Sequence, residues 1–293
     1  MDIDNIKFSV IGGDERFAYL SDGLGKKGYE VSCFGFDELE FPLKYTVKCP
    51  SVADAKSGAG CLILPLPYTK DGVNINTPFT KRKICISEVF ENIPADTVVF
   101  AGKCDEKLTA LSKNSKCRLV DYMDCEDIAI LNTVPTAEGA IEIAMKETVF
   151  TLHGAEIAVC GFGRVGAILA YKLKSLGANV SVYARRDEVL CLARAYGYKA
   201  VKIQNIDREI FKFDIIFNTV PSMIFSHSLI DRMNKKTLII DLASLPGGVD
   251  FPYAEAVGLK AISALSLPGK CAPKSAGEIL MNGILGILRK GQI

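Results

Sequence analysis

The stretch V-C-G-F-G-R-V-G at residues 159–166 decides the fold, because its three glycines have the spacing G-x-G-x-x-G. An apolar, strand-like run precedes it and a helix-like pattern follows it. Strand, glycine turn and helix in this order are the context that a dinucleotide-binding fold requires. Gly161 would form the tight turn, Gly163 would admit a pyrophosphate close to the backbone, and Gly166 would let the helix pack on its strand. The helix N-terminus then offers amide groups to the phosphates.

A pair of arginines follows the second predicted strand, residues 179–183, about twenty residues beyond the glycines. An NAD-selective fold places an Asp or Glu there, whereas arginines suit the 2′-phosphate of NADP. Arg185 and Arg186 can both form bidentate bonds with a phosphate. The sequence therefore predicts NADP. In the alternative interpretation the arginines are solvated and Asp187 contacts the ribose.

Four more strand patterns follow, at 199–203, 214–222, 237–241 and 260–262. The carboxyl ends of parallel strands meet at one edge of a sheet, so their loops should converge on one crevice. We expect the nicotinamide ring to be held by the loops that contain Thr219, Pro221, Ala243 and Ser244. The complete set of predicted cofactor-binding residues is Gly161, Phe162, Gly163, Arg164, Val165, Gly166, Ala184, Arg185, Arg186, Thr219, Val220, Pro221, Ala243, Ser244, Leu267 and Pro268.

The first half of the chain repeats the pattern without the third glycine. A strand pattern at 6–11 leads into Gly12-Gly13 and a helix pattern at 17–27. Asp14 and Arg16 follow the glycines, where open α/β sheets bind ligands. Capping of the helix explains the two residues equally well.

Strands alternate with helices along the whole chain, with further strand patterns at 29–34, 61–65, 98–100 and 119–121. This alternation predicts an α/β fold with two Rossmann-like, doubly wound parallel sheets and a cleft between the two domains. We place the substrate and catalytic domain at 1–132, completed by a return helix at 275–293, and the NADP-binding domain at 133–274. A helix at 137–146 should join them, capped by Thr133 or Thr136, with Glu138 in its first turn.

Composition excludes several other classes of protein. The 293 residues include 35 basic and 34 acidic side chains, so no net field favours nucleic acid. No apolar run is long enough to cross a bilayer, and the acidic start is unlike a secretory signal. Ten cysteines without a C-x-x-C pair predict a reduced, cytoplasmic protein. Only two histidines are present, and the residues around them complete neither a metal site nor a Ser-His-Asp triad.

Several blocks of sequence, spread in order over nearly the whole chain, resemble the family of dipicolinate synthase A subunits. Two departures weaken the transfer of carboxylate-binding residues: Leu245 stands where a basic residue is expected, and Cys125-Glu126 replaces a basic-acidic pair. The blocks are residues 11–14, 127–130 with 135–136, 161–166, 218–222, 241–244 with 246–248, and 267–269 with 272–277.

The resemblance implies oxidation of dihydrodipicolinate, a lysine-branch intermediate, to dipicolinate (pyridine-2,6-dicarboxylate), with NADP accepting a hydride. It further implies sporulation in the mother-cell cytoplasm and partnership with the flavoprotein-like B subunit of dipicolinate synthase. A homo-oligomer is compatible with the sequence, which leaves the oligomeric state open. The sequence also leaves open whether turnover needs the B subunit, and whether the substrate is dihydrodipicolinate or its hydrated precursor.

A dianionic substrate needs cationic or amide-lined pockets. We expect these from Arg16, Lys274 and the helix amides at Thr136. An exposed helix-start position explains Lys274 equally well. The candidates for the proton acceptor are His227, which could instead lie on a helix surface, and Glu138, which could instead favour its helix dipole. A water molecule could also take the proton.

Two other functions fit the same architecture. One is an NADP-dependent dehydrogenase of a 2-hydroxy or 2-oxo acid, although its usual Arg, Glu and His set is hard to assemble from two histidines. The other is a cofactor-binding subunit without turnover, which fold alone does not exclude.

Overall fold

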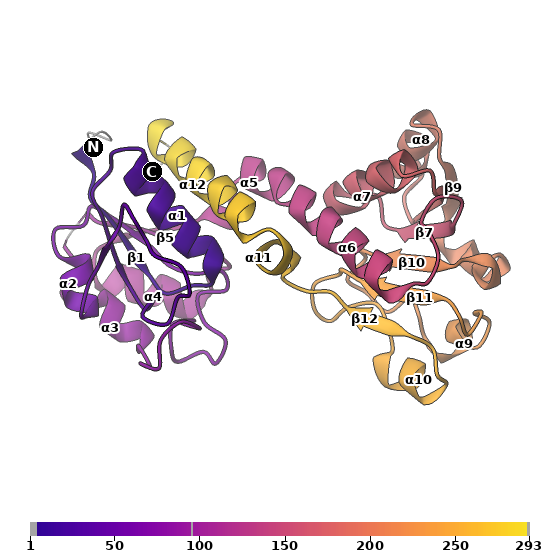
Figure 1. Ribbon diagram of the computed structural model, residues 1–293, viewed down its shortest axis with the longest axis horizontal. Helices are drawn as coiled ribbons and strands as arrows, with labels where there is room; N and C mark the ends of the chain where they lie inside the picture. Colours follow the sequence, from indigo (N-terminus) through magenta and orange to yellow (C-terminus); the bar gives the residue numbers. More distant parts are fainter. Residues whose placement is uncertain (1–4, 95, 292–293) are drawn as a thin grey trace. The chain divides into compact units, whose positions relative to one another are not determined.

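The computed structural model describes residues 5–94 and 96–291, and the chain divides into two compact units (Figure 1). Unit 1 comprises Met1–Asn132 and Ala272–Ile293, and unit 2 comprises Thr133–Cys271. The chain therefore leaves unit 1 once and returns to it through its last helix. Each unit contains a six-stranded sheet with helices on both faces.

The sheet of unit 1 has the order β3-β2-β1-β4-β5-β6, and every pairing is parallel. Its central strands are buried on both faces, which explains their unbroken apolar runs. The edge strand β3 was not predicted, because it has two residues and both are exposed. The strands are β1 Phe8–Ile11, β2 Val31–Phe34, β3 Val47–Lys48, β4 Cys61–Ile63, β5 Val98–Ala101 and β6 Arg118–Asp121.

The helices of unit 1 include the last long helix of the chain, α12, which packs along α1 (Figure 1). This packing is close at Gly277, where a Cβ atom would lie 2.4 Å from the carbonyl oxygen of Arg16. The helices are α1 Glu15–Lys26, α2 Val52–Lys56, α3 Ile86–Phe90, α4 Glu106–Asn114, the 3₁₀ turn η2 Tyr122–Asp124, α5 Glu126–Leu131 and α12 Pro273–Arg289.

The sheet of unit 2 has the order β12-β11-β10-β7-β8-β9, again with parallel pairings throughout. Counted from the first strand of each unit, both sheets have the order 3-2-1-4-5-6 of a dinucleotide-binding fold. The predicted pair of doubly wound sheets is confirmed. The strands are β7 Glu156–Cys160, β8 Asn179–Ala184, β9 Lys199–Lys202, β10 Ile215–Asn218, β11 Leu238–Asp241 and β12 Ala261–Ser263.

The first helix of unit 2, α6, begins earlier than predicted. It spans Thr133–Glu147, so Thr133 and Thr136 lie within the helix and Glu138 lies beyond its first turn. The prediction that either threonine caps a helix starting at residue 137 was wrong. Pro135 lies in the first turn, where its missing N–H group costs no hydrogen bond, so it does not delay the helix. The other helices are α7 Arg164–Ser175, α8 Asp187–Ala195, η3 Ile203–Arg208, η4 Ile210–Lys212, α9 His227–Ile230, α10 Phe251–Ala256 and α11 Leu267–Cys271.

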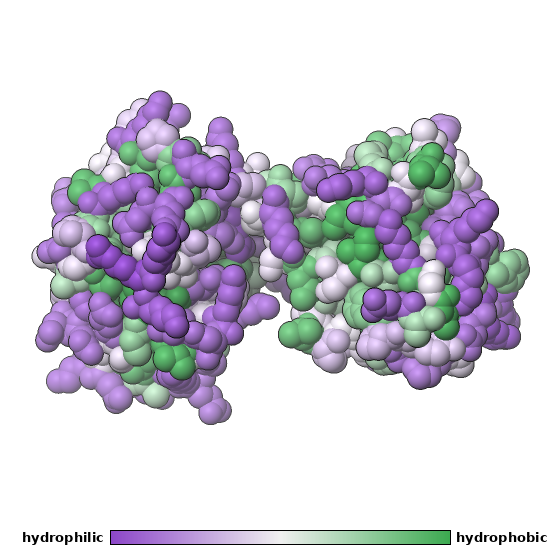
Figure 2. Space-filling model, turned by 60° about the horizontal axis from the view of Figure 1, so that its bottom comes forward, coloured by the Kyte–Doolittle hydropathy of each residue, from purple (hydrophilic) through white to green (hydrophobic). Residues whose placement is uncertain are grey.

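The surface of each unit has its own character. In the view of Figure 2, unit 1, at the left, is largely hydrophilic, whereas unit 2, at the right, shows a larger apolar area. Among the described residues, no helix has the length and apolar character needed to cross a membrane.

Candidate functional site

The turn between β7 and α7 has the geometry that its glycines predict. Gly161 has φ +94°, in the left-handed region, and a Cβ atom there would lie 2.2 Å from Thr219 Oγ1. A Cβ atom on Gly166 would lie 2.2 Å from the carbonyl oxygen of Gly161. Both positions therefore require glycine, the first for the turn and the second for close packing of α7 on β7.

The middle glycine, Gly163, faces open space. A Cβ atom built on it has no heavy atom within 4 Å, and Gly163 is the N-cap of α7. As a glycine, the N-cap residue has no side chain with which to cap this helix end. A helix N-terminus beside an open glycine is the cradle that a dinucleotide pyrophosphate fits. The residues present at this turn therefore fit a nicotinamide dinucleotide.

A small pocket of about 140 Å³ lies beside this turn, at the carboxyl ends of β7, β8 and β10. Arg185 and Arg186 follow β8 and are both exposed at its rim. Arg186 Nη1 lies 3.2 Å from Glu188 Oε1, while the Arg185 guanidinium has no hydrogen-bond or ion-pair partner within residues 5–94 and 96–291. The pocket is lined by Gly161, Phe162, Gly163, Ala184, Arg185, Arg186, Val189, Ile203 and Val220.

The competing ribose ligand, Asp187, is already engaged by a lysine. Lys202 Nζ lies 2.7 Å from Asp187 Oδ1 and donates a hydrogen bond of 2.9 Å to the carbonyl oxygen of Arg185. Lys202 was not predicted, although it ends β9 and pairs in register with Ala184 at the end of β8. The rule that ligand-binding residues follow adjacent strands could have found it.

Three residues of the glycine stretch differ in where their side chains lie. Phe162 is 7% exposed, and its ring packs edge-on against Tyr198 at 5.6 Å between centroids. Arg164 is exposed in the first turn of α7, and Val165 beside it is half-buried. The arginine adds a cation close to the open turn.

A buried polar pair, Asn218 and Asp241, organises the loops at the ends of the adjacent strands β10 and β11. Asn218 Nδ2 donates to Asp241 Oδ1 at 2.8 Å, and Asp241 also accepts hydrogen bonds from the backbone N–H groups of Ala243 and Gly248. Thr219 Oγ1 donates to the carbonyl oxygen of Cys160. These hydrogen bonds therefore fix the loops that are expected to hold the nicotinamide ring. Sequence analysis missed this pair, although both residues end apolar strands.

The remaining residues predicted near the nicotinamide ring lie in different environments. Ala243 is buried, whereas Pro221 and Ser244 are exposed at the loop tips. Leu245, where a basic residue was expected, is 82% exposed. The structure brings these residues to neighbouring strand ends, because the N–H group of Leu242 donates to the carbonyl oxygen of Asn218.

Leu267 and Pro268 lie in α11 and are both buried. A Cβ atom on Gly139 of α6 would lie 3.2 Å from Leu267 Cβ, so this leucine packs α11 onto α6. The small pocket beside the β7–α7 turn does not include either residue. Packing of α11 on α6 therefore explains these two apolar residues without a contact to the cofactor.

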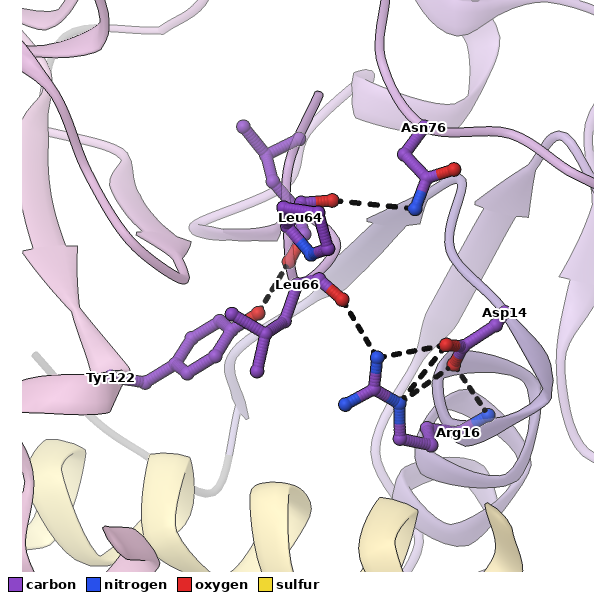
Figure 3. Close-up of polar contacts among 7 residues, drawn as sticks. Asp14, Arg16, Leu64, Leu66, Asn76 and Tyr122 are labelled. Carbon is purple, nitrogen blue, oxygen red and sulfur yellow. Dashed lines mark hydrogen bonds and ion pairs between the residues drawn. The ribbon is translucent and has the colours of Figure 1, made fainter. Parts of the chain in front are cut away.

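The corresponding turn in unit 1 is filled by the protein itself (Figure 3). Asp14 is the N-cap of α1, and its carboxylate forms a salt bridge with Arg16 Nη2 at 2.8 Å. The same Nη2 donates to the carbonyl oxygen of Leu66 at 2.7 Å, and Arg16 Nε also donates to Asp14. Arg16 is 4% exposed. Capping is thus established for Asp14, and the charge of Arg16 is paired.

The glycines of this first turn are closely covered. The N–H group of Gly13 donates to the carbonyl oxygen of Asn76, and a Cβ atom on Gly13 would lie 2.5 Å from the ring of Phe17. Tyr122, near Arg16, donates its hydroxyl to the carbonyl oxygen of Leu64 (Figure 3), and burial raises its pKa well above the usual value. This turn lacks the open approach of Gly163.

The two candidate proton acceptors have other partners. His227 Nε2 lies 2.9 Å from Asp250 Oδ2 and its ring stacks on Tyr253, while its side chain is 65% exposed. Glu138 Oε1 lies 2.8 Å from Lys172 Nζ, which ties α6 to α7 on the surface of unit 2. These contacts give both residues a structural explanation.

The remaining two substrate-binding candidates belong to different units. Lys274 lies in the first turn of α12, is exposed, and lines a groove along α1 in unit 1. Thr136 lies in the first turn of α6 in unit 2 and is half-buried.

Two parallel sheets of this order, one with an open glycine turn, define a nicotinamide dinucleotide-binding protein of the dehydrogenase type. Consistent with this, residues 135–244 match the model of the D-isomer specific 2-hydroxyacid dehydrogenase NAD binding domain, and residues 7–123 match that of the N-terminal domain of the dipicolinate synthase A subunit. The chain is 36% identical over 291 residues to the dipicolinate synthase A subunit of Bacillus subtilis, covering 99% of this chain and 98% of that protein. The chain belongs to the family of dipicolinate synthase A subunits.

Solved structures agree with this assignment. The crystal structure of the dipicolinate synthase A chain from Bacillus subtilis matches with a TM-score of 0.87, over 98% of this chain and 97% of that chain. The dipicolinate synthase A subunit from Bacillus halodurans matches with the same TM-score and 36% identity, over 97% of both chains. The similarity therefore extends over both units.

Proposed function

We propose that this chain oxidises dihydrodipicolinate to dipicolinate with NADP, together with the B subunit of dipicolinate synthase, in the mother-cell cytoplasm of a spore former. The observation that carries the proposal is the open β7–α7 turn beside two arginines, in a chain of the dipicolinate synthase family. Family membership supports the substrate and the partner, and the turn supports the cofactor.

The cofactor preference follows from the charges around the small pocket. Arg185 has an unpaired guanidinium among the described residues, and Lys202 Nζ, 2.7 Å from Asp187 Oδ1, offsets the negative charge of that carboxylate. A 2′-phosphate can accept charge-assisted hydrogen bonds from both arginines, whereas a ribose hydroxyl lacks the negative charge they favour. We therefore propose that NADP binds more tightly than NAD.

The bound nicotinamide supplies the hydride acceptor, while the dihydropyridine ring loses one hydride and one proton and becomes aromatic. The protein mainly has to orient the substrate. In unit 2, the Asn218–Asp241 pair fixes the loops that contain Thr219 and Ala243. These loops are proposed to position the nicotinamide ring.

For the substrate, we propose Arg16 of unit 1 as a carboxylate-binding group. Arg16 Nε and Nη2 are committed to Asp14 and Leu66, which leaves Nη1 as the donor without a partner among the described residues. Asp14 thus fixes the orientation of the guanidinium. We propose that water takes the proton, because His227 and Glu138 are exposed and paired with Asp250 and Lys172.

The test is turnover by the purified chain supplied with freshly generated dihydrodipicolinate, with and without the B subunit. Dipicolinate absorbance and nicotinamide reduction are followed together, with NADP and NAD compared at equal concentration. The proposal predicts that both signals rise together and that NAD substitutes poorly. If NADP binds but neither signal moves even when the B subunit is present, the chain is a subunit without this activity or a dehydrogenase of another acid.

A further inference from the structure

Unit 1 contains a groove of about 870 Å³ between α1, α12 and residues 41–45. One face of each helix lines it, with Tyr19 and Lys26 from α1 and Lys274 and Glu278 from α12. Its volume lies within the range of about 300–1,000 Å³ typical of small-molecule sites. The groove runs along the second half of α1. The carboxyl ends of the strands lie at the other end of this helix, where Asp14 caps its start, so the groove lies away from them.

The loop wall of this α1–α12 groove is fixed to α1 by its backbone. Asp22 Oδ1 accepts hydrogen bonds of 2.7 Å from the N–H groups of both Lys44 and Tyr45. A Cβ atom on Gly25 would lie 2.0 Å from the carbonyl oxygen of Tyr45, so glycine lets the loop lie directly against the helix. The side chains of Lys44 and Tyr45 are exposed on this anchored loop. Such preorganisation lowers the entropy cost of binding a ligand.

The groove carries an excess of positive charge. Its lysines are Lys26, Lys27, Lys44 and Lys274, against the carboxylates of Asp22 and Glu278, which leaves four minus two, or two, positive charges. Within the described part of the chain, no salt bridge or hydrogen bond engages any of the four ammonium groups. The mutual repulsion of unpaired positive charges from three different segments is reduced most directly when a polyanion binds.

Helix stability explains only part of this charge. Lys26 lies in the last turn of α1, where a cation favours the helix dipole. Lys274 lies in the first turn of α12, where a cation opposes the dipole, and neither an acidic residue in that turn nor a hydrogen-bonding cap from Ala272 compensates it. An anion in the groove would compensate both Lys274 and the helix end.

Aromatic rings lie beside these charges. Tyr19 and Phe41 stack with 4.8 Å between their ring centroids, and Tyr45 is 52% exposed on the anchored loop. A solvent-exposed tyrosine on a fixed backbone is a surface on which a flat ring can stack. The groove therefore combines cations with aromatic surface.

We propose that the α1–α12 groove binds an aromatic polyanion, a flat ring that bears at least two carboxylates or phosphates. Two sources share this chemistry: a pyridine dicarboxylate and a nucleotide. The inference rests on unit 1 alone and stands or falls separately from the turnover proposed above.

The experiment is calorimetric titration of the full chain carrying Gly163→Val, which blocks the dinucleotide turn of unit 2. The probes are pyridine-2,6-dicarboxylate, ATP and the aliphatic tricarboxylate tricarballylate. We expect the groove to bind one aromatic ligand per chain, distinguished from binding at Arg16 by the lysine variants below, with the tighter of the first two probes identifying the source. Binding should weaken with added salt, because exposed charges are screened.

Matched double variants locate the site. Lys44→Gln with Lys274→Gln should weaken binding about tenfold, the loss expected when charge-assisted contacts are removed. Lys70→Gln with Lys113→Gln removes two exposed lysines of unit 1 outside the groove and should leave affinity unchanged. The proposal is overturned if neither aromatic probe binds, if both double variants bind alike, or if tricarballylate binds as tightly as the aromatic probes.

Discussion

The first strand of each unit leads through two glycines into a helix, yet the two turns differ in what covers them. In unit 2, Gly163 faces open space and, as the N-cap of α7, has no side chain of its own. In unit 1, Phe17 and the backbone of Asn76 cover Gly13, and Asp14 caps α1. The two sheets share one strand order, so topology alone does not make a phosphate site. We therefore base the proposed phosphate site on the open glycine at the start of α7.

Among the substitutions that test this difference between the two turns, the largest expected effect is a loss of stability of unit 1. Gly13→Val places a side chain against Phe17 at a φ of +109°, which should cost about 2–5 kcal/mol from strain and overpacking together. Urea denaturation measures the loss. Gly28→Val is the matched control, because its φ is +97° and no atom lies within 4 Å of its Cβ position. Equal losses would show that Phe17 does not cover the turn as described.

The same substitution in the open turn should spare stability and remove binding. Gly163→Val meets no neighbouring atom, so it should cost at most about 1 kcal/mol, the scale of an altered N-cap. It blocks the approach of a pyrophosphate, and NADP affinity should fall about 100-fold, or about 2.7 kcal/mol. Calorimetry measures the affinity. Unchanged NADP binding would place the dinucleotide elsewhere.

A smaller change concerns which dinucleotide the open turn selects. Arg185→Gln with Arg186→Gln should weaken NADP about 10- to 30-fold and leave NAD within about twofold, because only the 2′-phosphate contacts are lost. Lys235→Gln with Lys236→Gln, an exposed pair elsewhere in unit 2, serves as the control. A parallel loss of NAD affinity would mean that the arginines bind another part of the cofactor.

The smallest effect is expected for the surface pair on α6 and α7. Glu138→Gln removes a partly exposed salt bridge with Lys172, which is worth about 0.5 kcal/mol. Turnover should stay within about twofold and its pH profile should not move. A large loss of kcat with a displaced pH profile would instead identify Glu138 as the proton acceptor.

The sequence alone was enough to predict the architecture of two parallel sheets. Buried parallel strands are unbroken apolar runs, so the central strands of both sheets could be located, whereas the two exposed residues of β3 carry no such signal. The predicted start of α6 at residue 137 is wrong, because the helix begins at Thr133 and includes Pro135 in its first turn, where proline is tolerated.

The candidate site was predictable only where backbone geometry dictates residue type. Gly161 and Gly166 could be assigned because their positions exclude a side chain. The Asn218–Asp241 pair and the Lys202–Asp187 contact join different strands, and single-sequence spacing does not show such contacts.

The central claim is that the open turn of unit 2, and not the covered turn of unit 1, binds the cofactor phosphates. Hydrogen–deuterium exchange with and without NADP tests it directly, because both turns are read in one experiment. The account predicts slowed exchange at residues 161–168 and 184–188, with residues 12–18 unchanged. Slowed exchange confined to residues 12–18 would contradict it.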